Sequence, residues 1–195
     1  SMNDYMDYYF ISIFMTRIFL ALTLEKDLND QIIEIKKQLK SNLLKDANIS
    51  WQRNDHHHLT IYFAGMMEPE QIIEMNEELS KINLASFSKL IDLTEISFFP
   101  NENSQVLSAL VKPNSNLHTL HEEVEKIIVN IGLGSDLKAY RPHITLGRFK
   151  EKNRSQYVFD QLNVPLKGKV KKLGVFESEF RSGKTEYTLL NGFEL

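Results

Sequence analysis

Apolar residues in the first half of the chain recur with the two periods that distinguish helices from strands. Recurrence every three or four positions is typical of one helix face, and short alternating or continuous runs are typical of strands. The helical period, with intervals of four, three and four residues, occurs at Leu28, Ile32, Ile35 and Leu39. A second helix is predicted from Pro69 to residue 82, because proline suits the first turn of a helix. Strands are predicted at residues 17–24, 58–65, 90–99 and 106–112.

The second half of the chain repeats this order of elements. A helix is predicted from residue 115 to residue 131, and Gly132 ends it. Strands are predicted at residues 143–149, 170–178 and 186–193, the last two joined by a turn at residues 182–184. No long linker rich in proline, glycine or serine separates the two blocks. The pattern therefore favours an α+β fold of two intimately packed lobes.

An apolar tract near the N-terminus, residues 8–24, has the composition of a membrane segment but not its length. The tract has 17 residues, and Arg17 lies within it, where a charge is costly in lipid. We therefore expect a buried strand here and no association with a membrane. Residues 1–14 are interpreted as an N-terminal extension, and residues 15–195 as a single bilobal domain.

The composition is that of a globular protein, with 42% hydrophobic and 25% charged residues among 195. Cysteine is absent, which excludes disulfides, thiolate metal ligands and thiol nucleophiles and fits a cytoplasmic location. The formal net charge is −3, yet residues 138–172 contain ten basic and only two acidic residues. This basic segment favours a local anionic ligand, and a solvated lysine-rich loop is the alternative.

One short pattern occurs twice, as His-Leu-Thr-Ile at residues 58–61 and as His-Ile-Thr-Leu at residues 143–146. Because alternate side chains of a strand share a face, each copy places its histidine and threonine on one side and its apolar residues in the core. Two such strands, brought together by a duplicated fold, would line opposite walls of one cleft.

This combination suits in-line substitution at phosphorus without a metal. With a pKa near 6.5, one of His58 and His143 can accept a proton from the attacking oxygen while the other donates one to the leaving oxygen. Thr60 and Thr145 can donate hydrogen bonds to the non-bridging oxygens as negative charge builds up. The residues alone do not decide which histidine is the acid.

The sequence resembles the 2H phosphoesterases, and among them the bacterial and archaeal RNA 2′,3′-cyclic phosphodiesterases, historically called 2′-5′ RNA ligases. The resemblance extends over nearly the whole chain from Arg17 and rests on the segments at residues 58–65, 141–148, 176–178 and 183–187. It implies two pseudo-symmetric lobes, each an antiparallel sheet with helices on its outer face, that enclose a central cleft.

The resemblance also implies a function, the metal-independent hydrolysis of RNA 2′,3′-cyclic phosphate ends to 2′-phosphomonoesters. His58 would be the proton donor and His143 the proton acceptor, with Thr60 and Thr145 binding the phosphate. The partners would be RNA ends or small cyclic-phosphate nucleotides, with no cofactor, and a monomer is the default for this chain length. The alternatives are a phosphodiesterase or ligase acting on 2′-5′ RNA linkages and a non-catalytic module that binds RNA ends.

Three further residues are candidates for substrate binding. Tyr62 and Phe149 fall on the faces of the motif residues by strict alternation, so they would stack on a base or serve in packing. Arg148 matches the family pattern and suits an anion, but strict alternation places it on the face opposite His143. It reaches the cleft only if the strand twists or bulges.

Three other signals are interpreted as structural. The run of histidines at residues 56–58 lacks a third metal ligand of suitable spacing, so we expect no metal site. His118 and His121 are expected on an exposed helix face. The Ser-Gly-Lys-Thr sequence at residues 182–185 resembles a phosphate-binding loop but precedes a predicted strand, so a hairpin turn is the better interpretation.

Overall fold

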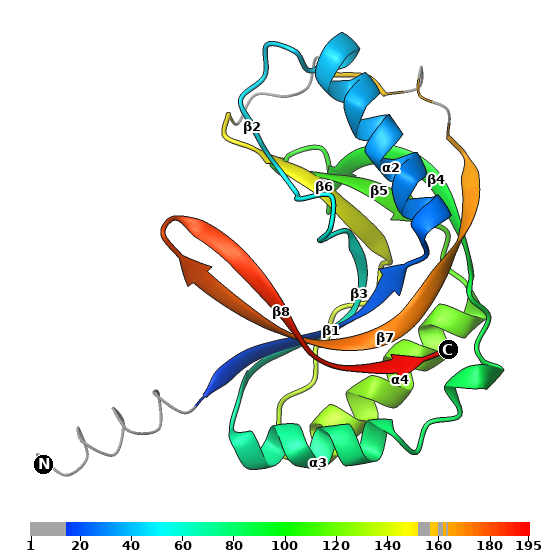
Figure 1. Ribbon diagram of the computed structural model, residues 1–195, viewed down its shortest axis with the longest axis vertical. Coiled ribbons are helices and arrows are strands. Elements are labelled where there is room, and N and C mark those ends of the chain that lie inside the picture. The colour runs from blue at the N-terminus through cyan, green and yellow to red at the C-terminus, as the bar shows by residue number, and fades with distance from the viewer. Residues whose placement is uncertain (1–14, 152–156, 160–161, 163) are drawn as a thin grey trace, which may run out of the picture.

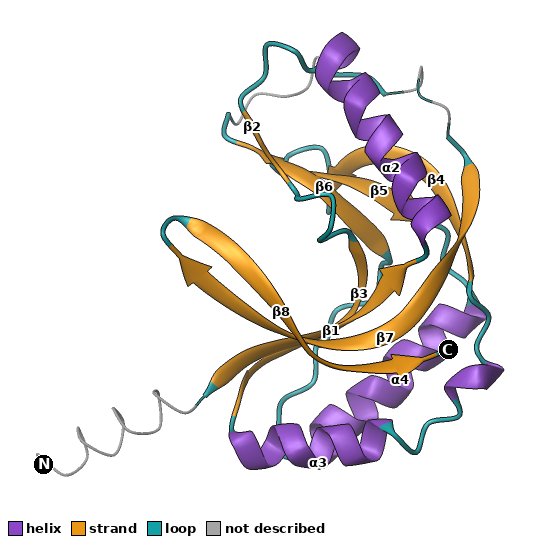
Figure 2. Ribbon diagram, in the orientation of Figure 1, coloured by secondary structure: helices purple, strands orange, loops and turns teal. Residues whose placement is uncertain are grey.

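The computed structural model describes residues 15–151, 157–159, 162 and 164–195 and confirms the predicted α+β fold class (Figures 1 and 2). The predicted N-terminal extension, residues 1–14, lies outside the described residues. The strands are β1 (Thr16–Leu24), β2 (Ile49–Trp51), β3 (His58–Met67), β4 (Leu90–Phe99), β5 (Val106–Val111), β6 (His143–Phe149), β7 (Leu166–Arg181) and β8 (Lys184–Glu194). The α-helices are α2 (Lys26–Gln38), α3 (Pro69–Leu79) and α4 (Ser115–Asn130), with a π-helical turn at Leu39–Leu43 and a 3-10 turn at Leu84–Ser86.

The eight strands pair antiparallel in the order β2-β6-β5-β4-β7-β1-β3, and β8 pairs with β7. Within this order, strand–helix–strand units recur: β1, α2 and β3 correspond to β5, α4 and β6. In each unit the first strand pairs with the strand that carries the His-x-Thr motif. The two halves of the fold therefore repeat one arrangement, as the sequence pattern indicates.

Strand β7 joins the two halves. Its first residues, 166–169, pair with β4, and the following residues, 170–177, pair with β1. Its last part continues with β8 as a long hairpin that projects beyond the other strands (Figure 1). Every sequence-predicted strand is present, but β7 and β8 are longer than the pattern indicated, and the short strand β2 was not predicted.

The helices lie on opposite outer sides of the strands, with α2 on one side and α3 and α4 on the other (Figure 2). Helix α2 follows β1 in sequence but packs on β7, where Leu28 lies against Gly168. Helix α4 links β5 to β6 but packs on β3 of the other half. Because each half is covered by the helix of the other, the buried apolar side chains form one cluster. No helix among the described residues has the length and apolar character needed to cross a bilayer.

Replacement of Gly168 by alanine is expected to destabilise the fold by about 1–3 kcal/mol, the usual effect of overpacking. A Cβ at this position would lie 2.6 Å from Cδ1 and 2.8 Å from Cβ of the buried Leu28, so α2 would have to move away from β7. Urea denaturation measures the change. The matched control is Gly134→Ala, where a Cβ meets no atom within 4 Å. Equal stabilities of the two variants would contradict this account of the packing.

Candidate active site

His58 and His143 line one cavity of about 500 Å³, together with Thr60 and Thr145. Strand β3 supplies the first pair and β6 the second, and these two strands contact one another across the two halves of the fold. The apolar residues of both motifs are buried on the opposite side of the strands. The structure thus brings together the four residues that the repeated motif singles out.

Both histidines are fixed in the same way. Nδ1 of His58 donates to the carbonyl oxygen of His56 at 2.7 Å, and Nδ1 of His143 donates to the carbonyl oxygen of Arg141 at 2.9 Å. A hydrogen bond from Nδ1 to a backbone carbonyl sets the tautomer and leaves Nε2 for chemistry. Each histidine is therefore held by the carbonyl two residues before it, with one ring nitrogen available to accept or donate a proton.

Aromatic side chains surround His58. Its ring centroid lies 5.1 Å from that of Phe19 and 5.5 Å from that of Tyr187, which meets it edge-on. Burial lowers the pKa of His58, and the hydrogen bond to the His56 carbonyl opposes this shift because it favours the charged ring. The neutral form of the imidazole is thereby made more accessible near neutral pH.

His143 stacks on Phe99, with ring centroids 3.6 Å apart. The Arg141 guanidinium lies over the Phe99 ring, 4.9 Å from its centroid, and donates to the carbonyl oxygen of Pro100. Burial lowers the pKa of His143, and the positive charge of Arg141 lowers it further, while the hydrogen bond to the Arg141 carbonyl raises it. The environment therefore favours the neutral form of His143.

A buried lysine of α2 holds the loop that precedes His58. Lys36 is only 2% exposed and donates to the carbonyl oxygen of Gln52, to Oδ1 of Asn54 at 2.8 Å and to Nε2 of His57 at 3.0 Å. His57 in turn donates from Nδ1 to Asn29. Burial and the charge of Lys36 lower the pKa of His57 to about 3, so its ring is neutral. His57 thus belongs to the supporting framework of the loop.

Both motif strands contain an extra residue directly after the threonine. In β3, Thr60 pairs with Ala21 and Tyr62 with Leu20, so Ile61 has no partner on β1. In β6, residue 145 pairs with residue 108 and residue 147 with residue 107, which leaves residue 146 unpaired in the same way. Such a bulge reverses the face on which the following side chains lie.

This reversal corrects the predictions for Tyr62 and Phe149, which strict alternation placed on the cleft face. Tyr62 is 3% exposed, and its hydroxyl accepts from the amide of Asp136 at 3.0 Å. Phe149 is 1% exposed and packs edge-on against Phe98. One bulged residue shifts each side chain to the core, so the packing alternative holds for Phe149, while the buried Tyr62 still contributes to a cavity next to the central one. His121 is likewise buried, against Tyr62, instead of lying on an exposed helix face.

The same reversal brings two other residues to the face of the histidines. Phe63, at the position after Tyr62, is 70% exposed and lines the central cavity. Arg148, at the corresponding position of β6, is exposed on the face of His143 and Thr145, although it does not line the cavity itself. Lining residues that the sequence interpretation missed are Arg17, Phe19, Gln52, Ser178 and Tyr187. Their positions depend on pairing between distant strands, which no local pattern reveals.

Two further cavities adjoin the central one. The first, of about 380 Å³, shares His58 and Tyr187 with it and is lined also by Lys172; we call it the Lys172 cavity. The second, of about 490 Å³, shares Thr60, Phe63 and His143 with the central cavity and is lined also by Lys138, Tyr140 and Arg141. The three cavities therefore form a series of neighbours, with one on each side of the central cavity.

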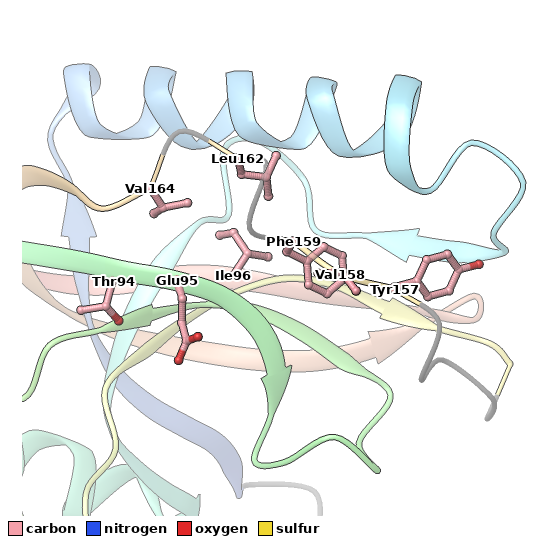
Figure 3. Close-up of a pocket in the computed structure, with 8 residues that line it drawn as sticks. All are labelled: Thr94, Glu95, Ile96, Tyr157, Val158, Phe159, Leu162 and Val164. Carbon is pink, nitrogen blue, oxygen red and sulfur yellow. The ribbon is translucent and has the colours of Figure 1, made fainter.

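A fourth hollow is separate from this series. It lies between α2 and β4 and is lined by residues of β4 and by residues 157–159, 162 and 164 (Figure 3). Ile96, Phe159, Leu162 and Val164 contribute apolar side chains to its wall, beside the polar Thr94 and Glu95. Neither motif contributes to it, so it has no part in the chemistry of the histidines.

Sequence comparisons agree with the geometry. The profile of the 2′-5′ RNA ligase superfamily matches residues 30–179. An Archaeoglobus fulgidus protein named RNA 2′,3′-cyclic phosphodiesterase is 28% identical over 138 residues, which cover 70% of this chain and 74% of that protein. A Thermotoga maritima protein of the same name is 26% identical over 135 residues, which cover 69% of this chain and 70% of that protein.

Solved structures share the fold. A Thermus thermophilus protein superposes with a TM-score of 0.75 at 22% identity over 92% of this chain and 97% of that one. Escherichia coli LigT, solved with 3′-AMP, superposes with a TM-score of 0.72 at 20% identity over 93% of this chain and 98% of that one. The profile match includes both motifs and most of the described strands, and it confirms the resemblance drawn from the sequence: this chain belongs to the 2′-5′ RNA ligase superfamily.

Proposed function

We propose that this protein hydrolyses 2′,3′-cyclic phosphates at RNA ends to 2′-phosphomonoesters, with His58 and His143 as the acid and base. The observation that carries the proposal is the shared cavity, into which two tautomer-fixed histidines and two threonines project from separate strands. The relatives named RNA 2′,3′-cyclic phosphodiesterase and the LigT structure with 3′-AMP support this choice of substrate.

In the proposed reaction, water attacks phosphorus in line with the bond to the ribose 3′ oxygen. Nε2 of His143 takes a proton from the water as the new P–O bond forms. Nε2 of His58 gives its proton to the 3′ oxygen as the old P–O bond breaks. The products are a 2′-phosphate and a free 3′ hydroxyl, and both proton transfers are supplied by side chains.

The assignment of His143 as the base and His58 as the acid follows the family resemblance, and the Arg141 charge is compatible with it. The base must be neutral when water attacks, and the Arg141 guanidinium favours the neutral form of His143. Among the described residues no guanidinium acts on His58, where burial is the main cause of the lowered pKa and the neighbouring His56 and His143 lower it further. A bound phosphate would raise the pKa of either ring, because an anion stabilises the imidazolium.

The threonines are proposed to bind the non-bridging phosphate oxygens. Thr60 and Thr145 lie two residues after their histidines on the same strand face, before each bulge. Hydroxyl donors at fixed positions stabilise the charge that develops on these oxygens in the transition state. Because both threonines precede the bulge, their alignment with the histidines does not depend on it.

His143→Ala is expected to lower kcat for a cyclic-phosphate-ended oligonucleotide by roughly 10²–10⁴-fold, the usual contribution of a general acid or base, while the Kd of the product changes little. Assays in EDTA test metal independence at the same time. The control is His118→Ala on the exposed surface of α4.

Tight binding of RNA ends without turnover by the wild-type protein would favour the non-catalytic binding module. Turnover of a 2′-5′-linked oligonucleotide but not of the cyclic phosphate would favour the activity on 2′-5′ linkages.

The pH profile of kcat/KM is expected to be bell-shaped with its maximum on the acid side of pH 6.5. The rate falls at low pH because the base becomes protonated, and at high pH because the acid loses its proton. Burial lowers the pKa of both histidines in the free enzyme, so both limbs move to lower pH. In Arg141→Gln the limb due to His143 should shift to higher pH, since a positive charge is removed. A rate that only rises with pH and is abolished by a chelator would contradict the two-histidine mechanism.

Phe63→Ala is expected to raise KM severalfold with little loss of stability, because this exposed ring is available for stacking on a base. Phe149→Ala is the matched contrast and is expected to cost about 3–5 kcal/mol of stability, because its ring is buried in the core. Steady-state kinetics and urea denaturation of both variants measure the two effects. A large loss of stability in Phe63→Ala, with a raised KM and little loss of stability in Phe149→Ala, would contradict the change of face at the bulges.

A further inference from the structure

The Lys172 cavity lies next to the central cavity on the side of His58. The two cavities share His58 and Tyr187, and the Tyr187 ring stands edge-on to His58 and 5.3 Å from the ring of His56. The remaining wall comes mainly from the loop before β3 and from β7. A ligand whose reacting end lies between the two histidines can therefore extend past Tyr187 into this second space.

Lys172 gives the cavity a positive charge. Its stem lies over Gly192 of β8, where an added Cβ would stand 3.2 Å from Cδ, so the glycine leaves room for the side chain. Glu194 faces Lys172 across the strand pair, yet within the described part of the chain Nζ takes part in no ion pair. The carboxylate that lines the cavity, Asp55, is held by two hydrogen bonds from Arg53.

The direction of the reaction determines which part of the substrate lies near Lys172. In-line attack places the water and the leaving 3′ oxygen on opposite sides of phosphorus. His58, as the acid, lies next to the leaving oxygen, so the ribose that carries this oxygen lies on the His58 side. The 5′ carbon of the same ribose carries the phosphate that links it to the preceding nucleotide, and the adjoining space is the Lys172 cavity.

We infer that the Lys172 cavity binds the 5′-phosphate of the terminal nucleotide, with Lys172 as its cationic partner, and so selects oligonucleotide ends over cyclic mononucleotides without a 5′-phosphate. The inference rests on the proposed function and adds to it a second anion site and a substrate class. An ammonium group that forms no ion pair with any described carboxylate, and that lines a cavity, is suited to such a phosphate.

The test compares adenosine 2′,3′-cyclic phosphate with its 5′-phosphorylated form and with the dinucleotide ApA ending in a 2′,3′-cyclic phosphate. For the wild-type protein we expect kcat/KM to be about tenfold higher for the two substrates that carry a 5′-phosphate, as one charge-assisted hydrogen bond allows. Lys172→Gln should remove this preference and leave kcat/KM for the unphosphorylated substrate within about twofold. The matched control is Lys171→Gln, an exposed neighbour on the opposite face of β7.

Two outcomes would overturn the inference: equal kcat/KM values with and without the 5′-phosphate in the wild-type protein, or an equal loss on all three substrates in Lys172→Gln. A binding measurement distinguishes a failure of this inference from a failure of the proposed function. Calorimetry with adenosine 2′-phosphate and adenosine 2′,5′-bisphosphate should show tighter binding of the bisphosphate by the wild-type protein and equal binding by Lys172→Gln. If no cyclic phosphate is hydrolysed, the proposed function fails, and this comparison alone decides on the Lys172 site.

Discussion

The pairing of β7 with strands of both halves is the constraint on which the site depends. One continuous backbone pairs first with β4 and then with β1, so the two halves cannot move apart without loss of its ladder. Helices α2 and α4 add to this by packing on the half to which they do not belong in sequence. Catalysis by two groups from different strands needs such a framework, because small displacements of a reacting group reduce the rate strongly.

The environment of the histidines combines burial with a fixed tautomer. Burial in aromatic surroundings makes the charged ring less favourable, and the backbone carbonyl on Nδ1 restores part of its stability. The result is a pair of rings whose pKa values lie below the ordinary value, each with Nε2 unengaged by its own loop. The carbonyl that binds His58 belongs to a loop with further hydrogen bonds. The Gln52 side chain donates to the carbonyl of His56, and Lys36 donates to the carbonyl of Gln52. The orientation of His58 is thus linked to a buried lysine in α2.

Local periodicity was sufficient to predict the motif strands, the three α-helices and the shared face of each histidine and threonine. It failed beyond the threonines, because a bulge is a mismatch between two strands and cannot be detected in either one alone. Strict alternation therefore placed Tyr62 and Phe149 in the cleft and Arg148 outside it, whereas Phe63 and Arg148 lie on the face of the histidines. Periodicity also does not reveal the role of Lys36, because its partners follow in a loop whose path depends on the tertiary fold.

The basic segment at residues 138–172 illustrates the difference between a charge count and a charge distribution. In sequence it is one run, but the structure separates its first residues from its last. Lys138 and Arg141 line the cavity on the His143 side, and Lys172 lines the cavity on the His58 side. Lys167 and Lys169 are exposed and line none of these three cavities. A chain with a net charge of −3 can therefore present cations on both sides of the histidine pair without a continuous basic surface. Such an arrangement favours a short anionic ligand that passes between the histidines over a long duplex, whose binding requires many phosphate contacts along one face.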